Sequence, residues 1–215
     1  MWKECRNNLA SPTAVAAAST VAVGTDLQVC PDPGRNNIRG RGGKWTTGYT
    51  HGSIRLAQMI KDNFKDRKSS PRIKGFDYKG MLAYHITVCT LDKQCIFSTD
   101  ESVRLISDIL LEDAEKEKFV VHTYCFMPDH LHTLMIGTDV ESSLYNMMKR
   151  FKQRSNFHFR KRFGIKLWQR SYYDHIVRKD EDIDVIARYI LGNPVRKGLV
   201  EDFTKYPFSG SVIKL

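Results

Sequence analysis

The 215-residue chain lacks several features that mark common classes of protein. No stretch approaches the roughly 20 apolar residues of a membrane-spanning helix, so we expect no membrane partner. The alanine-rich segment 10–24 has neither Leu nor Phe and follows Glu4, unlike a secretory signal peptide. The five cysteines show no C-x-x-C spacing, which argues against a zinc finger or a disulfide framework. These absences predict a protein of the reducing cytoplasm.

Acidic residues are also scarce relative to basic ones. The chain has 34 Lys and Arg against 24 Asp and Glu, a formal net charge of +10. Residues 149–170 contain nine Lys or Arg and no acid, a pattern that favours binding to a phosphate backbone. Interleaved aromatic residues in the same segment are expected to belong mainly to the core. The predicted DNA-binding residues are Lys149, Arg150, Lys152, Arg154, Arg160, Lys161, Arg162 and Arg170.

The N-terminal third differs in composition from the rest of the chain. Residues 31–44 are rich in Pro, Gly and Arg, and residues 1–80 carry 14 basic but only 6 acidic residues. Such a composition predicts a disordered or poorly structured basic extension over residues 1–70 and a single domain over 71–215. Met59 is an alternative natural start, in which case residues 1–58 would not belong to the native protein.

Two histidines lie between two segments that are typical of strands. A Pro-Asp turn directly precedes His130 and His132, and apolar residues flank the motif on both sides. Residues two apart in a strand point to the same face, so both imidazoles would project together while Leu131 enters the core. Two imidazoles on one face can hold one divalent metal ion. The alternative is a pair of unrelated surface histidines, which the hairpin context disfavours.

A helix is predicted further along the chain, over residues 181–192. Pro194 should end it near Asn193, because the residue before a proline avoids the α region. Tyr189 and Asn193 lie one turn apart, so a phenol and an amide oxygen could face the same metal-bound phosphate. Periodicity alone favours another interpretation of Tyr189, as a packed tyrosine with a hydrated hydroxyl. The apolar stripe of this helix consists of Ile183, Ile186 and Ile190.

The order of the expected elements predicts an α+β fold. Strands are expected at 81–90, 119–127, 131–137 and 171–178, and helices at 100–117, 141–162 and 181–192. This β-α-β-β-α-β order, followed by the helix that carries Tyr189, is the ferredoxin-like split βαβ pattern. The last segment, residues 203–215, is expected to be coil anchored by Tyr206-Pro207-Phe208.

The motifs together resemble the single-tyrosine HUH transposases, and within them the REP-associated tyrosine transposases. The resemblance covers roughly residues 71–210. The matching segments are Pro71-Arg72-Ile73, Tyr84-His85-Ile86-Thr87, Met127-Pro128-Asp129-His130-Leu131-His132, Trp168-Gln169-Arg170-Ser171-Tyr172-Tyr173-Asp174-His175, Tyr189-Ile190, Asn193-Pro194-Val195 and Gly198-Leu199-Val200.

This resemblance implies a role for each matching residue. His130 and His132 would be metal ligands, Tyr189 the nucleophile, and Asn193 a third ligand where related enzymes often carry Gln. Tyr172 and Tyr173 are rival nucleophiles, but they fall in an expected strand, whereas the nucleophile of the family lies on a helix.

The resemblance also implies a reaction and a substrate. The enzyme would cleave and rejoin single-stranded DNA hairpins through a covalent phosphotyrosine, with Mg²⁺ or Mn²⁺ as cofactor, as a monomer or a homodimer. Two other functions remain open. A non-catalytic nucleic-acid-binding module could share this fold, and so could an HUH nickase of plasmid replication or conjugation.

Overall fold

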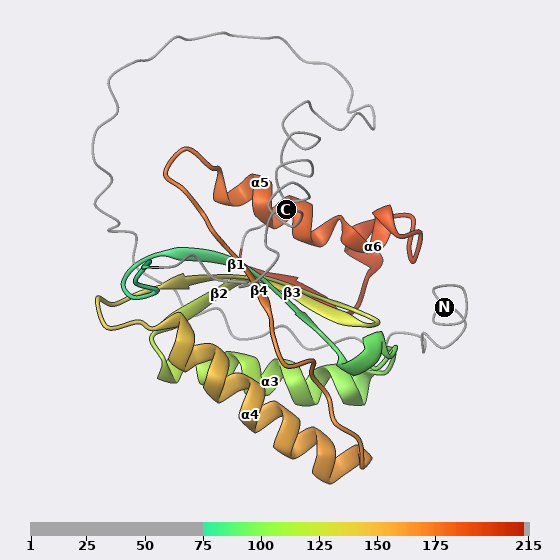
Figure 1. Ribbon diagram of the computed structural model, residues 1–215. Coiled ribbons are helices and arrows are strands. Elements are labelled where there is room, and N and C mark those ends of the chain that lie inside the picture. The colour runs from blue at the N-terminus through green and yellow to red at the C-terminus, as the bar shows by residue number, and fades with distance from the viewer. Residues whose placement is uncertain (1–74, 213–215) are drawn as a thin grey trace, which may run out of the picture.

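The computed structural model describes residues 75–212, so the predicted extension over 1–70 lies outside the described residues. The expected order of strands and helices is confirmed, apart from the elements added after residue 192 and two short 3₁₀ turns (Figure 1). The elements are β1 (Ala83–Cys89), η1 (Leu91–Lys93), α3 (Asp100–Lys116), β2 (Phe119–Met127), β3 (His130–Gly137), α4 (Leu144–Phe163), β4 (Tyr173–Ile176), α5 (Ile183–Leu191), α6 (Asn193–Arg196), η2 (Phe203–Lys205) and β5 (Ser209–Ser211).

The strands form one antiparallel sheet in the order β4-β1-β3-β2-β5. The first four strands in this order have the ferredoxin-like arrangement, so the predicted α+β fold is confirmed. Helices α3 and α4 cover one face of the sheet, while α5 and α6 lie over the other (Figure 1). The sheet therefore separates the basic helix α4 from the helix that carries Tyr189.

The core between the sheet and helices α3 and α4 follows the expected periodicity. Val103, Ile106 and Leu110 of α3 are buried, as predicted. Helix α3 begins where the side chain of Thr99 accepts a hydrogen bond from the backbone N–H of Ser102, which satisfies one unpaired donor of the first turn. Helix α4 buries the stripe Leu144, Met147, Met148, Phe151, Ser155 and Phe159.

The C-terminal segment differs from the expected coil. Tyr206 and Phe208 are buried, which confirms them as the anchor. The Tyr206 hydroxyl donates to the backbone oxygen of Phe126 at 2.7 Å. Directly after this anchor, β5 pairs with β2 and forms a sheet edge. The expectation of coil was wrong here because Ser-Gly-Ser has little strand propensity, so neighbouring contacts decide the conformation.

The helix break near Asn193 also differs from the expectation. Helix α5 ends at Leu191, but α6 begins at Asn193, with Pro194 in its first turn. Proline is well suited to a first turn because its missing N–H would have no intrahelical partner there. Pro194 therefore starts a second short helix, and Tyr189 and Asn193 lie on different helices.

Within residues 75–212, no helix is both long and apolar enough to cross a membrane. Cys89 and Cys125 are free thiols; Cys125 is buried and Cys89 is half-buried. Cys95 is disulfide-bonded.

Candidate active site on the sheet

The two motif histidines lie on the face of the sheet covered by α5, which we call the histidine face. Thr87 of β1 pairs directly with His132 of β3, so both side chains project from this face. His85, two residues before Thr87, projects from it as well. Leu131 points the other way and is fully buried. The predicted same-face arrangement of His130 and His132 is therefore confirmed.

The nitrogen atoms of the two motif histidines converge. Nε2 of His130 lies 3.0 Å from Nε2 of His132. Two ligands at right angles around an ion bound at roughly 2.1 Å would be about 3.0 Å apart, so this spacing fits one divalent ion. Among residues 75–212, no group of three or more His, Cys, Asp or Glu is arranged to hold a metal. The pair would thus leave most coordination positions to water or substrate.

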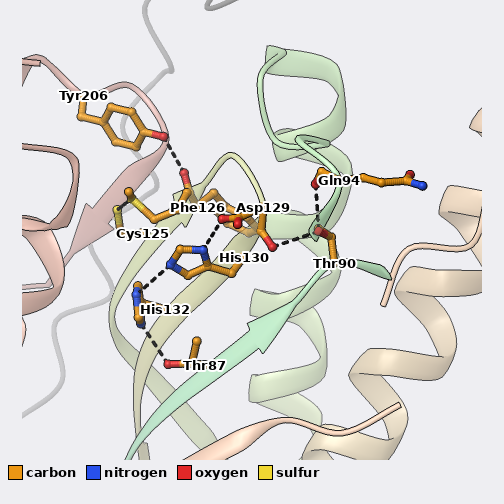
Figure 2. A network of polar contacts seen from close by, with 10 residues as sticks. Thr87, Thr90, Gln94, Cys125, Phe126, Asp129, His130, His132 and Tyr206 are labelled. Atoms are coloured by element: carbon orange, nitrogen blue, oxygen red, sulfur yellow. Dashed lines mark hydrogen bonds and ion pairs between the residues drawn. The ribbon is translucent and has the colours of Figure 1, made fainter. Parts of the chain in front are cut away.

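Asp129 fixes the outer side of this pair (Figure 2). Its carboxylate contacts Nδ1 of His130, which directs Nε2 of that ring toward His132. The backbone oxygen of Asp129 accepts hydrogen bonds from the N–H and the hydroxyl of Thr90. The hairpin turn is therefore tied to the end of β1. A carboxylate behind a histidine is the usual way to orient a metal ligand.

His132 is held from its other ring nitrogen. Its Nδ1 lies 3.0 Å from Oγ1 of Thr87 and 3.3 Å from Nε2 of His85. If Nε2 of His132 binds a metal, Nδ1 carries the proton and donates to one of these neighbours. His85 and Thr87 belong to a segment that matches the transposase family, but their role was not predicted from the sequence. Their i, i+2 spacing in a strand, the same as that of His130 and His132, was the signal available.

Burial keeps the inner histidines neutral. It lowers the pKa of His85 to about 3, with a further contribution from the charge of His175. Burial, followed by the charges of His130, His85 and Arg196, lowers the pKa of His132 well below its ordinary value. A neutral imidazole is the form that binds metal ions, so these residues are ready to serve as ligand and supporting group at neutral pH.

The buried His85 predicts an acid-sensitive fold. In metal-free protein, an unfolded histidine takes up a proton near pH 6.5, whereas native His85 stays neutral until about pH 3. The unfolded state therefore binds more protons between these values, and stability should fall as pH falls, by about 1.4 kcal/mol per pH unit for such a residue. We expect His85→Gln to show a smaller drop in Tm between pH 7 and pH 5, measured with a chelator present. His158→Ala, which removes an exposed histidine, should keep the wild-type drop, and an unchanged drop in His85→Gln would contradict the assignment.

Tyr189 lies beside this histidine array. The buried residues Ile186 and Ile190 fix α5 against the sheet, and Tyr189 is half-buried on the same helix. Its ring meets the ring of His85 edge-on, with centroids 6.3 Å apart. The guanidinium of Arg196 covers the ring at 4.0 Å from the centroid. The phenol is thus both packed and adjacent to the residues that support His132.

Asn193 is engaged elsewhere. Its amide nitrogen donates to the backbone oxygen of Ile190 at 3.1 Å, and its amide oxygen accepts from Arg196 at 2.7 Å. The amide oxygen predicted to bind metal is thus already bonded to a cation. No contact in the described part of the chain joins Asn193 to His130 or His132.

The rival tyrosines occupy different positions. Tyr172 is buried, with the ammonium of Lys152 5.9 Å from its ring centroid. Lys152 belongs to α4, so this phenol faces away from the histidines. Tyr173 pairs with Thr87 and is 42% exposed, which leaves it on the histidine face at the sheet edge. Tyr173 is therefore the stronger rival to Tyr189.

Half of the predicted DNA-binding residues have partners within the protein. Arg150 and Arg154 both bind the buried carboxylate of Asp113, which joins α4 to α3. Lys152 donates to three backbone oxygens between residues 169 and 171. Arg162 pairs with Glu101. Among residues 75–212, the salt bridges do not include the other four predicted residues, Lys149, Arg160, Lys161 and Arg170.

Comparisons with known proteins agree with this fold and sequence. Residues 79–193 match the family described as "Transposase IS200 like". A candidate REP-associated tyrosine transposase of Haemophilus influenzae is 28% identical over 147 residues, which cover 61% of this chain and 80% of that protein. The REP-associated tyrosine transposase of Escherichia coli is 26% identical over 110 residues, 49% of this chain and 62% of that protein.

A solved structure shares the fold. It is that of a REP-associated tyrosine transposase bound to a REP hairpin, and it superposes with a TM-score of 0.54 at 18% identity. The match covers 64% of this chain and 81% of the other. The resemblance to REP-associated transposases is thereby confirmed. The family match over residues 79–193 spans more than half of this chain, so the chain belongs to the IS200-like transposase family.

Proposed function

We propose that this transposase cleaves and rejoins single-stranded DNA hairpins, with Tyr189 as the nucleophile. One observation carries the proposal. The Tyr189 ring packs against His85, and His85 contacts His132, whose Nε2 converges with that of His130. A packed core tyrosine would have no need of two imidazoles with converging nitrogens nearby. A phenol next to a divalent-ion site is suited to attack a phosphodiester.

The reaction conserves the energy of the phosphodiester bond. The phenol loses its proton and its oxygen bonds to phosphorus, while the bond from phosphorus to the departing DNA oxygen breaks. The departing oxygen takes up a proton and becomes a free hydroxyl. Attack by a DNA hydroxyl on the phosphotyrosine reverses these steps and joins the strands, so no nucleotide cofactor is required.

The donor set suits a divalent cation. His130 and His132 would hold Mg²⁺ or Mn²⁺ through their Nε2 atoms, with Asp129 and Thr87 or His85 fixing the two rings. When bound, the ion would polarise the phosphoryl oxygens and orient the scissile bond. Two nitrogen ligands leave room for the oxygen ligands that these ions prefer.

A DNA surface is available on the outer side of α4. Exposed positions recur every four residues along this helix: Tyr145, Lys149, Gln153, Phe157 and Lys161. Tyr145 is 51% exposed and Phe157 63% exposed, so two aromatic rings accompany the cations. Cations follow a phosphate backbone, and exposed rings can stack on unpaired bases. The structural relative bound to a REP hairpin supports a hairpin as the ligand.

This surface predicts that binding and folding depend on different cations of one helix. Lys149→Ala with Lys161→Ala should weaken hairpin binding and lower the slope of log affinity against log salt by about 0.9 per lost phosphate contact, with an unchanged Tm. Arg150→Ala, the matched control, should instead lower stability by about 1–3 kcal/mol, because it removes a partner of the buried Asp113 carboxylate. Titrations at several salt concentrations and thermal unfolding separate the two effects. Unaltered binding by the double lysine variant would contradict this surface.

A covalent-adduct assay tests the proposed function itself. Purified protein with Mn²⁺ or Mg²⁺ is mixed with labelled single-stranded hairpin DNA from beside its own gene and resolved on a denaturing gel. We expect a protein–DNA adduct and a shortened free strand, both absent with chelator. Tight hairpin binding without any adduct would favour a non-catalytic binding module instead. Adducts with a plasmid origin but not with dispersed hairpins would favour a replication-type nickase.

A further inference from the structure

Arg196 makes three contacts that converge on Tyr189. Its guanidinium carbon lies 4.0 Å from the centroid of the Tyr189 ring. One nitrogen of the same group donates to the backbone oxygen of Tyr189 at 2.6 Å and to the amide oxygen of Asn193 at 2.7 Å. A planar guanidinium can stack on a ring and donate from its edge at the same time, which an ammonium cannot.

The sequence between the two residues allows this approach. A Cβ added to Gly192 would lie 2.9 Å from a terminal nitrogen of Arg196 and 3.2 Å from the backbone oxygen of Arg188. Any side chain at this position would therefore displace the guanidinium. Asn193 is anchored in turn by its hydrogen bond to the backbone oxygen of Ile190. The break between α5 and α6 thus brings Arg196 back over the helix that carries Tyr189.

We propose that Arg196 is a positioning residue for the nucleophile. The amide oxygen of Asn193 holds its guanidinium in place, and Gly192, which has no side chain, leaves room for it. This inference rests on the proposed function, because it assigns Arg196 a role only through Tyr189. The Tyr189 ring contacts the His85 ring in a T-shaped arrangement and the Arg196 guanidinium through its face. Without the guanidinium, the ring could turn about its side-chain bonds and leave the position beside the histidines. Small displacements of a reacting group cost large factors in rate.

The kinetic test measures the rate of adduct formation at saturating hairpin and metal. Arg196→Ala should lower this rate about 10- to 100-fold, with hairpin affinity and Tm close to wild type. Arg196→Lys, which keeps the charge but not the planar stack, should recover only part of the rate. Arg188→Ala removes an exposed arginine of α5, the helix that carries Tyr189, and should match wild type. A wild-type rate in Arg196→Ala would overturn the proposal, as would a loss confined to hairpin affinity.

A second measurement needs neither DNA nor metal. Fluorine NMR of protein labelled with 3-fluorotyrosine, with the Tyr189 signal assigned from Tyr189→Phe, reports the surroundings of the ring. Arg196→Ala and Gly192→Ala should both shift this signal toward its position in unfolded protein, and Arg188→Ala should not. Unshifted signals would overturn the inference even if adducts form. If the variants shift the signal but the wild-type protein forms no adduct, Arg196 positions the Tyr189 ring and the proposed function is rejected.

A double-mutant cycle separates the two roles offered for Asn193. If Asn193 acts by holding Arg196, the rate losses of Asn193→Ala and Arg196→Ala should overlap, so the double variant is little slower than Arg196→Ala alone. Independent roles would make the losses multiply. If the two rate losses multiply and Asn193→Ala also weakens Mn²⁺ binding, Asn193 does not act by holding Arg196. Such a result would support Asn193 as a metal ligand.

Discussion

Replacement of Tyr189 by Phe should abolish the covalent adduct and lower strand cleavage by about 10³-fold or more, while hairpin affinity changes less than about twofold. The reason is chemical: only the phenolic oxygen is lost. The ring still packs against His85 and under Arg196, so the site should keep its shape. Single-turnover cleavage, the denaturing-gel adduct assay and a binding titration on the same preparations would measure the three effects.

The matched controls are the rival tyrosines. Tyr172→Phe should retain the adduct, because that ring faces Lys152 of α4 on the other side of the sheet. Tyr173→Phe should retain it too, although Tyr173 shares the histidine face with Thr87. An adduct that survives in Tyr189→Phe and disappears in Tyr173→Phe would move the nucleophile to the edge strand. It would also leave α5 as a purely structural helix.

Features encoded by local periodicity could be predicted from the sequence. The alternation of polar and apolar residues around His130 and His132 predicts a strand in which Leu131 is buried and both imidazoles share a face. The structure has this arrangement. The stripe of α3 is another example. In each case a repeat of two or 3.6 residues determines which side chains meet the core.

Contacts between distant segments could not be predicted in the same way. His85 and His132 are 47 residues apart and meet only because β1 pairs with β3 in one register. The same limit applies to segment 149–170: its nine basic residues without an acid indicate a free cationic surface, but α3 supplies carboxylates to several of them. Asp113 alone binds both Arg150 and Arg154. Charge counts along one segment therefore overestimate the cations available to DNA.

Asn193 shows a third limit, in which spacing along a helix fails because the helix breaks. Asn193 follows Tyr189 at position i+4, a spacing that would place the two side chains on the same side of one continuous helix. Gly192 ends α5, and Pro194 suits the first turn of α6, so Asn193 bonds to Ile190 and Arg196. The first helix ends close to the predicted residue. Asn193, directly before Pro194, nevertheless lies in a second helix, so the rule that the residue before a proline avoids the α region did not hold here.

His130→Ala and His132→Ala should each abolish cleavage, by about 10³-fold or more, and each should weaken Mn²⁺ binding measured by calorimetry. Hairpin affinity should change by less than about threefold, because the proposed DNA surface lies on α4, on the face of the sheet opposite α5 (Figure 1). Asp129→Asn, which keeps the size of the side chain but weakens its hold on His130, should lower activity about 10- to 100-fold.

The control is His158→Ala, which removes an exposed histidine of α4 and should leave cleavage at saturating DNA unchanged. Two results would reject the metal assignment. Cleavage that persists in His132→Ala with unaltered Mn²⁺ affinity would mean that the converging nitrogens bind no essential ion. A parallel loss of cleavage, hairpin binding and Tm would mean that the histidines support the fold, since His132 is also a packing neighbour of Thr87 and His85. Only loss of metal and cleavage with retained binding fits a catalytic site whose ligands are separate from its DNA surface.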